Sequence, residues 1–218
     1  MVLKQGDFIE LDYTGKIKDT GLVFDTTRKD IAEKNDLQNR SAVYKPIIIC
    51  IGENNVVSGL DSGLEGKEAG REYHMELKPE ESFGKKNAKL IQLVSAAKFK
   101  EQKVSPYAGM QINIDGAIGT IKHVSGGRVM VDFNHPLAGL DVIYDIKINR
   151  LVEDDAEKVK ALFELKLNVP DKDIEVKIEG DTAKLKFRKG INIPSELIKI
   201  FQNDITRVVP NVKKLETQ

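Results

Sequence analysis

The 218-residue chain carries 34 lysine and arginine residues and 34 aspartate and glutamate residues, so its formal net charge is zero. That balance, together with 40% hydrophobic residues, is typical of a globular protein and lacks the basic footprint of a protein that binds nucleic acid or anionic lipid. No apolar run approaches the roughly 20 residues of a membrane-spanning helix, and the N-terminus has no apolar core of signal-peptide length, so we expect a cytoplasmic protein without nucleic-acid or membrane partners.

The first 80 or so residues alternate between apolar and polar positions, as short strands do. This alternation predicts strands over 8–18, 22–24, 47–51 and 72–77. A helix is expected to begin at Thr27, which resembles an N-cap with an acidic residue three positions on, and a second helix is expected over 56–64. The polar stretch around the first helix, residues 28–45, is expected to form a surface lobe.

The stretch from about residue 88 to residue 132 has the pattern of a separate small unit. A short helix is predicted first and three strands after it, over 93–99, 110–114, 118–124 and 128–132. Hairpin turns are predicted at Asp115-Gly116 and at Ser125-Gly126-Gly127. A strand predicted over 142–151 is needed to complete the sheet of the first unit, which makes the middle unit an insertion.

The last stretch of about 65 residues predicts an α-β-β-α-β unit. The acidic run Glu153-Asp154-Asp155 suits the positive end of a helix. A hairpin is predicted from strands over 174–178 and 183–187, a helix from Pro194, and a last strand over 208–215. This unit is large enough to fold separately, although it would be marginal alone.

Three motifs locate the chemistry of the chain, and none supplies a nucleophile, a phosphate cradle or a metal cage. They are Val23-Phe24-Asp25-Thr26-Thr27, the run from Asn55 to Asp61 with Gly63 to Gly70, and Phe133-Asn134-His135-Pro136-Leu137-Ala138-Gly139. Such residues are typical of a dry pocket that holds one carboxylate and one phenol. A reaction without bond cleavage suits this pocket, and rotation about a prolyl peptide bond is the obvious case.

The same residues also have purely structural interpretations. Phe24, Val57 and Tyr144 are compatible with an ordinary apolar core. Tyr13 is compatible with an ordinary strand aromatic, and Asp25 with a cap on the turn that follows it.

Metal and redox sites are not expected. The histidines are scattered and lack cysteine or carboxylate companions at ligand spacing; they are His74, His123 and His135. The single cysteine, Cys50, lies among isoleucines, where burial raises the pKa of a thiol and suppresses its reactivity. We therefore expect no metal ion and no cofactor.

Taken in order, the three motifs resemble those of the FK506-binding-protein (FKBP) family of peptidyl-prolyl cis-trans isomerases. The insertion that ends at Gly139 resembles the insert-in-flap chaperone domain of the SlyD-type branch, and the 28–45 lobe and folded tail resemble its longer archaeal members. The resemblance covers roughly residues 1–152. It implies an α+β fold with an FKBP-like antiparallel half-barrel sheet and one helix, an inserted small β-rich insert-in-flap domain, and a C-terminal α+β domain.

This resemblance also implies domain boundaries and a pocket. The catalytic domain would be residues 1–86 plus 134–152, the insert-in-flap domain 87–133, and the C-terminal domain 153–218. The implied catalytic residues are Tyr13, Phe24, Asp25, Val56, Val57, Leu60, Phe83 and Tyr144. Phe83 stands where most family members have tyrosine, so a hydrogen bond to the bound peptide carbonyl is lost. The histidine-rich and cysteine-rich metal tail of bacterial SlyD is absent from the sequence.

The function implied by the resemblance is prolyl isomerisation that accelerates folding, with the insert holding unfolded chains. The implied substrate-binding residues are Ile47, Ile49, Ile91, Leu93, Val94, Phe99, Val104, Tyr107 and Met110. The implied partners are unfolded or partly folded polypeptides with X-Pro bonds and a macrolide of the FK506 type. The tail is expected to pair two chains into a homodimer or to extend the binding surface. The alternatives are a chaperone holdase without significant isomerase activity and an assembly adaptor that acts through the tail.

Overall fold

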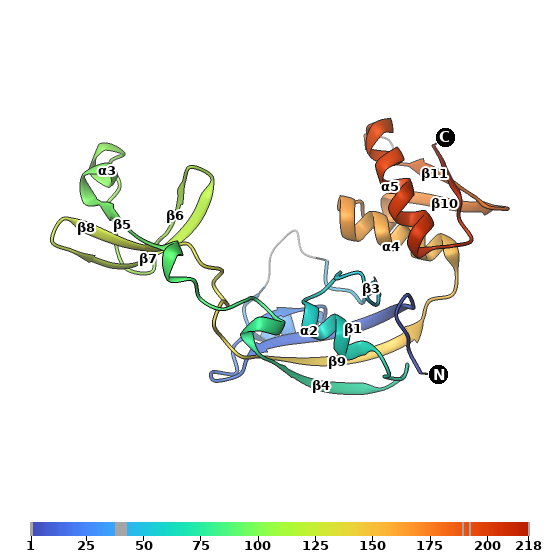
Figure 1. The fold of residues 1–218 in the computed structure, drawn as a ribbon, viewed down its shortest axis with the longest axis horizontal. Coiled ribbons are helices and arrows are strands. Elements are labelled where there is room, and N and C mark those ends of the chain that lie inside the picture. Colours follow the sequence, from blue (N-terminus) through green and yellow to red (C-terminus); the bar gives the residue numbers. More distant parts are fainter. Residues whose placement is uncertain (1, 38–42, 189, 192, 218) are drawn as a thin grey trace. The chain divides into compact units, whose positions relative to one another are not determined.

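The computed structural model describes residues 2–37, 43–188, 190–191 and 193–217. These residues form three β-sheets with helices beside them, which confirms the α+β prediction (Figure 1). The chain divides into two compact units, one of residues 1–82 with 141–218 and one of residues 83–140. None of the helices in the described parts of the chain has the length and apolar character needed to traverse a bilayer.

The first unit is built on an antiparallel sheet that agrees with the predicted strands. It contains β1 (Phe8–Ile17), β2 (Val23–Thr26), β3 (Ile47–Cys50), β4 (Glu72–Leu77) and β9 (Val142–Leu151). The order is β2-β1-β9-β4, and β3 pairs with the first part of β1. Strand β9 therefore fills the centre of the sheet although it follows the insertion in the chain, as predicted.

Two helices belong to this part of the unit, and both begin later than predicted. Helix α1 (Lys29–Lys34) has Arg28, not Thr27, at its N-cap, because the Thr27 hydroxyl donates to the Asp12 carboxylate at 2.7 Å. Helix α2 (Ser58–Leu64) begins two residues after the predicted start, since Val57 is still extended. It packs against β4, where Gly59 and Gly63 leave room for the side chains of that strand.

The C-terminal segment packs into the same compact unit. It comprises α4 (Asp155–Leu167), β10 (Ile174–Glu179), β11 (Thr182–Phe187), α5 (Ser195–Val208) and β12 (Lys214–Thr217), with β11 antiparallel to β10 and parallel to β12. The last strand starts later than predicted because α5 continues to Val208. The apolar core of this segment is continuous with Phe8, Cys50 and Val152 of the first part of the chain, and Arg207 pairs with Glu53.

Cys50 is buried, as expected from its isoleucine neighbours in the sequence. Its side chain is fully buried in this shared core, and desolvation raises the pKa of the thiol to about 12.

The second unit is a four-stranded antiparallel sheet with one helix, in the order β5-β8-β7-β6. Its elements are β5 (Ile91–Ser95), α3 (Ala96–Glu101), β6 (Gln111–Ile114), β7 (Ala117–Ser125) and β8 (Arg128–Asp132). The helix predicted over 93–99 is wrong in its first three residues, because these pair with β8 as the strand β5, and Ser95 caps the helix that follows. Both predicted hairpin turns are confirmed.

Two chain segments that enter and leave this second unit are joined by hydrogen bonds. Asn134 accepts from the Asn87 amide at 2.8 Å and donates to the Asn87 carbonyl at 3.1 Å. The Asp132 carboxylate accepts from the same Asn134 side chain at 2.7 Å and fixes its orientation. The Gly139 amide donates to the Gly84 carbonyl at 2.8 Å.

Candidate functional site

Three aromatic rings from three neighbouring strands meet on one face of the first sheet. The Tyr144 ring lies 5.9 Å from the Tyr13 ring, tilted by 57°, and 5.8 Å from the Phe24 ring, which meets it edge-on at 84°. These are favourable geometries for aromatic pairs. Strand alternation brings Tyr13 and Tyr144 together, because Gly15 is paired with Tyr144 across β1 and β9 and Tyr13 lies two positions before Gly15 on the same face. Phe24 joins them where the register between β1 and β2 shifts, since Gly15 pairs with Asp25 and Lys16 pairs with Val23.

A phenol and a carboxylate are joined at this aromatic cluster. The Tyr13 hydroxyl donates to Asp25 Oδ2 at 2.7 Å, while Asp25 itself remains exposed. Burial, and then the hydrogen bond to Asp25, raise the pKa of Tyr13 above its ordinary value, and burial likewise raises the pKa of Tyr144. Both phenols are therefore neutral donors over the physiological pH range.

The aliphatic residues of the expected pocket lie on the segment that leads into α2. Val56 and Val57 are half-buried, whereas Leu60 is buried within the helix. The buried Asp61 carboxylate accepts from the amides of Gly52 at 3.0 Å and Asn54 at 2.9 Å, which fixes the loop before the two valines. Asp61 lies in the second motif, but its partners are seven and nine positions earlier, beyond the reach of a local turn signal.

Three further residues of the expected site lie apart from the aromatic cluster or have little exposed surface. Ile47 is half-buried on β3, but Ile49 is fully buried opposite Ile9, so its side chain supports β1 and presents no surface. Phe83 belongs to the second compact unit, where its ring is stacked on His135 at 4.7 Å with an interplanar angle of 2°. A part for Phe83 in the pocket stays a prediction.

The residues expected to bind substrate on the insert separate into two groups. One group lines a groove of about 300 Å³ between α3 and β6; it consists of Val94, Phe99, Val104 and Met110, with Ile112 and Ile114 beside them. The other group is exposed to solvent; Leu93 is 61% exposed, Tyr107 is 65% exposed and Ile91 is 38% exposed. The insert thus combines an apolar groove with exposed apolar side chains.

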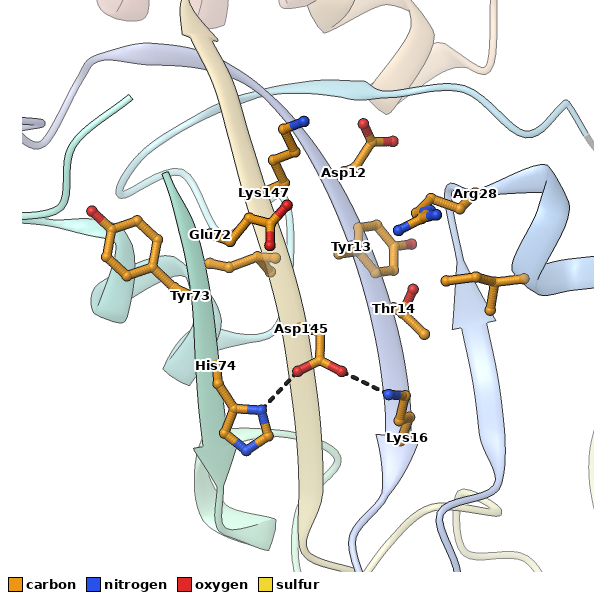
Figure 2. Close-up of a pocket in the computed structure, with 12 residues that line it drawn as sticks. Asp12, Tyr13, Thr14, Lys16, Arg28, Glu72, Tyr73, His74, Asp145 and Lys147 are labelled. Carbon is orange, nitrogen blue, oxygen red and sulfur yellow. Dashed lines mark hydrogen bonds and ion pairs between the residues drawn. The ribbon is translucent and has the colours of Figure 1, made fainter. Parts of the chain in front are cut away.

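A second, polar cleft of about 660 Å³ is lined mostly by polar side chains of the first sheet, and Tyr13 also lines it (Figure 2). Asp145 is held there between Lys16, whose Nζ lies 2.7 Å from Oδ2, and His74, whose Nδ1 lies 2.7 Å from Oδ1. Partial burial opposes ionisation of Asp145, but the hydrogen bonds from Lys16 and His74 outweigh it and lower its pKa. An ion pair occupies the centre of this cleft, and Ile31, Tyr73 and Ile146 add apolar surface to its lining. No motif in the sequence predicted it.

Comparisons with known proteins match segments of both compact units. A family model described as FKBP-type peptidyl-prolyl cis-trans isomerase matches residues 2–101, and a model described as FKBP26, IF domain, matches residues 92–137. The short-type peptidyl-prolyl cis-trans isomerase of Methanocaldococcus jannaschii is 29% identical over 156 residues, which cover 72% of this chain and 98% of that protein. The FKBP-type 16 kDa isomerase of Escherichia coli is 32% identical over 48% of this chain and 72% of its own length. The isomerase SlyD of Pasteurella multocida is 33% identical over 58% of this chain and 65% of its own length.

Proposed function

Because the chain belongs to the FKBP-type peptidyl-prolyl cis-trans isomerases, we propose that its isomerase site is the aromatic cluster of Tyr13, Phe24 and Tyr144, with Asp25 at the rim. The observation that carries this assignment is the combination of three rings in contact with a 2.7 Å hydrogen bond from a phenol to an exposed carboxylate. Val56, Val57 and Leu60 are assigned to the aliphatic side of the same pocket.

Rotation about a prolyl bond needs an environment that favours the twisted amide. The barrier is roughly 18–20 kcal/mol because resonance holds the amide planar, and uncatalysed exchange takes on the order of tens to hundreds of seconds. In the twisted amide the carbonyl oxygen carries less negative charge than in the planar amide. An apolar wall therefore destabilises the twisted amide less than the planar amide. A pocket that binds the twisted form more tightly accelerates the rotation.

Hydrogen bonds orient the peptide and the pocket in this scheme. Asp25 accepts from Tyr13, so the phenol ring is held against Tyr144 and the carboxylate is held at the rim. No proton moves between the enzyme and the substrate, so neither group needs a pKa near neutrality. The raised pKa of Tyr13 keeps it a hydrogen-bond donor.

Proline-limited refolding tests the isomerase assignment against the holdase alternative. Wild-type protein at catalytic ratios is expected to accelerate refolding. Asp25→Ala is expected to lower kcat/KM by about tenfold, because one hydrogen bond to a charged group is lost. Its circular dichroism is expected to be unchanged. Delayed aggregation without acceleration of refolding would instead support a holdase.

We also propose that the insert captures unfolded chains. An extended segment would place apolar side chains in the groove lined by Phe99, Val104 and Met110, and would contact the exposed Leu93 and Tyr107. Capture raises the effective concentration of prolyl bonds for an isomerase site on the same chain.

Replacing residues 88–132 by a short loop tests this division of labour. Isomerisation of a short peptide is expected to survive, whereas catalysis on an unfolded protein is expected to fall by more than about tenfold. Equal losses on both substrates would contradict the proposal.

The remaining partners follow from the same family assignment. We propose a macrolide of the FK506 type as a competing ligand of the isomerase pocket, which inhibition of peptide isomerisation would test.

For the tail we propose a homodimer contact at the groove of about 330 Å³ that includes Leu167, Ile193 and Leu197, next to the 66% exposed Ile200. Sedimentation of Ile200→Glu, expected to be monomeric, tests that contact. A cytoplasmic location is part of the proposal, because a lone buried thiol suits a reducing compartment.

A further inference from the structure

Gly15 lies at the centre of the aromatic cluster, buried on β1 between two site residues. Its cross-strand partners are Asp25 on β2 and Tyr144 on β9. A Cβ atom at this position would lie 2.6 Å and 2.7 Å from Cζ and Cε2 of Phe24, and 3.2 Å from Cε1 of Tyr144. The first two distances are shorter than van der Waals contact allows, so any side chain here displaces a ring.

The backbone at Gly15 does not itself demand glycine. Its φ lies outside the left-handed region, unlike that of many glycines in the turns of this chain. The constraint is therefore space above the strand, and that space is filled by the tip of the Phe24 ring. Glycine inside a strand often marks such a close approach.

We infer that Gly15 is a positioning residue of the isomerase site. Without a side chain, it lets the Phe24 ring lie over β1 with its edge against Tyr144, the arrangement that forms the aromatic wall. The inference rests on the proposed function, because it acts through the placement of Phe24.

A methyl group at Gly15 moves Phe24 and leaves the sheet intact. Tyr144 is 5% exposed and lies on a central strand, whereas Phe24 is only half-buried and lies on the edge strand β2. The Phe24 ring therefore yields first and turns away from Tyr144. Displacement of a binding group by about 1 Å costs up to roughly a hundredfold in rate, so a small movement is sufficient.

The test is a double-mutant cycle with a short X-Pro peptide as the substrate. Gly15→Ala is expected to lower kcat/KM by between about tenfold and a hundredfold, with unchanged far-ultraviolet circular dichroism. Phe24→Leu also lowers it, because the wall loses its ring. Adding Gly15→Ala to Phe24→Leu is expected to change kcat/KM by less than about twofold, since the shorter side chain leaves room for the methyl group.

Gly119→Ala is the matched control. Gly119 lies on β7 of the other compact unit, and a Cβ there would also meet a ring, 2.8 Å from Cδ1 of Phe133. This variant is expected to perturb packing of the insert and to leave peptide kcat/KM within about twofold of wild type.

Three results would overturn the inference, and they are distinguishable from failure of the proposed function. Wild-type activity of Gly15→Ala, beside reduced activity of Phe24→Leu, removes the role of Gly15 and leaves the pocket standing. Losses that multiply in the double variant show that Gly15→Ala acts through the backbone and not through Phe24. If Gly15→Ala does not fold, the double variant Gly15→Ala/Phe24→Leu decides. A clash with the Phe24 ring predicts that the double variant folds and has the activity of Phe24→Leu. Failure of the double variant to fold overturns the inference. Wild-type activity of Phe24→Leu would reject the proposed pocket itself.

Discussion

Strands β1 and β9 carry two faces that satisfy their polar groups in different ways. On one face Tyr13 and Tyr144 bury their rings and a single phenol is bonded to a carboxylate. On the other face Lys16 and Asp145 form an ion pair in a polar cleft, with His74 beside them. Because side chains alternate along a strand, successive residues of the same two strands build an apolar surface on one face and a charged surface on the other.

This difference shows why cleft size alone does not identify the site. The polar cleft encloses about 660 Å³, but its central charges are already paired with each other. Prolyl isomerisation needs an apolar wall and few fixed donors, and that combination lies on the aromatic face. Substitutions on the two faces are therefore expected to separate catalysis from surface electrostatics.

The largest effect is expected from Tyr144→Ala, which removes the ring at the centre of the aromatic face. Loss of a buried aromatic side chain is expected to lower the free energy of unfolding by about 3–5 kcal/mol. The lost wall is expected to reduce peptide kcat/KM by on the order of a hundredfold in the fraction that remains folded. Urea titration and a protease-coupled peptide assay measure the two quantities.

Lys147→Ala is the control on the opposite face of the same strand. Lys147 is exposed and lines the polar cleft, so the free energy of unfolding is expected to stay within about 0.5 kcal/mol of wild type and peptide kcat/KM within about twofold. A loss of activity as large as that of Tyr144→Ala would place the substrate in the polar cleft and reverse the assignment of the two faces.

An intermediate effect is expected from Tyr13→Phe, which removes only the hydroxyl bonded to Asp25. We expect kcat/KM to fall by about tenfold and the free energy of unfolding to fall by about 1 kcal/mol. Because burial raises the pKa of Tyr13, the wild-type rate is expected to stay flat from pH 7 to about 10, and stability is lost only as the pH rises beyond that ordinary value. A wild-type rate that declines between pH 7 and 9 would contradict a neutral phenol.

Local signals predicted most of the first sheet. Alternation located β1, β4 and β9, whereas Tyr13 and Asp25 were placed in one expected pocket by the family resemblance alone. The errors arose where a distant partner decided the local structure. Residues 93–95 adjoin a helix, and five residues are too short a run to separate a strand from a helical turn, but they pair with β8 some 35 positions later.

Distant partners also explain why capping and the polar cleft escaped prediction. Thr27 is a good N-cap by composition, but Asp12, 15 positions earlier, takes its hydroxyl. Asp145 joins Lys16, 129 positions away, and His74, 71 positions away. A pattern within one strand indicates which face a side chain takes but not which charges meet there.

The smallest effect is expected from Asp145→Asn, which breaks the charge pairs of the polar cleft. The hydrogen bonds from Lys16 and His74 hold the pKa of Asp145 below its ordinary value of about 3.9. The Asp145 carboxylate therefore stabilises the fold above that pH. This stabilisation is lost as the pH falls through the lower pKa of the folded state. Since the side chain is 43% exposed, screening limits the contribution to about 0.2–1 kcal/mol. Urea unfolding is expected to show this deficit in Asp145→Asn at pH 7 and a progressively smaller deficit as the pH falls below about 3.9, while peptide kcat/KM stays within about twofold. A deficit that does not shrink in acid would mean that Asp145 acts through packing and not through charge, and a large loss of kcat/KM would show that the two faces are coupled.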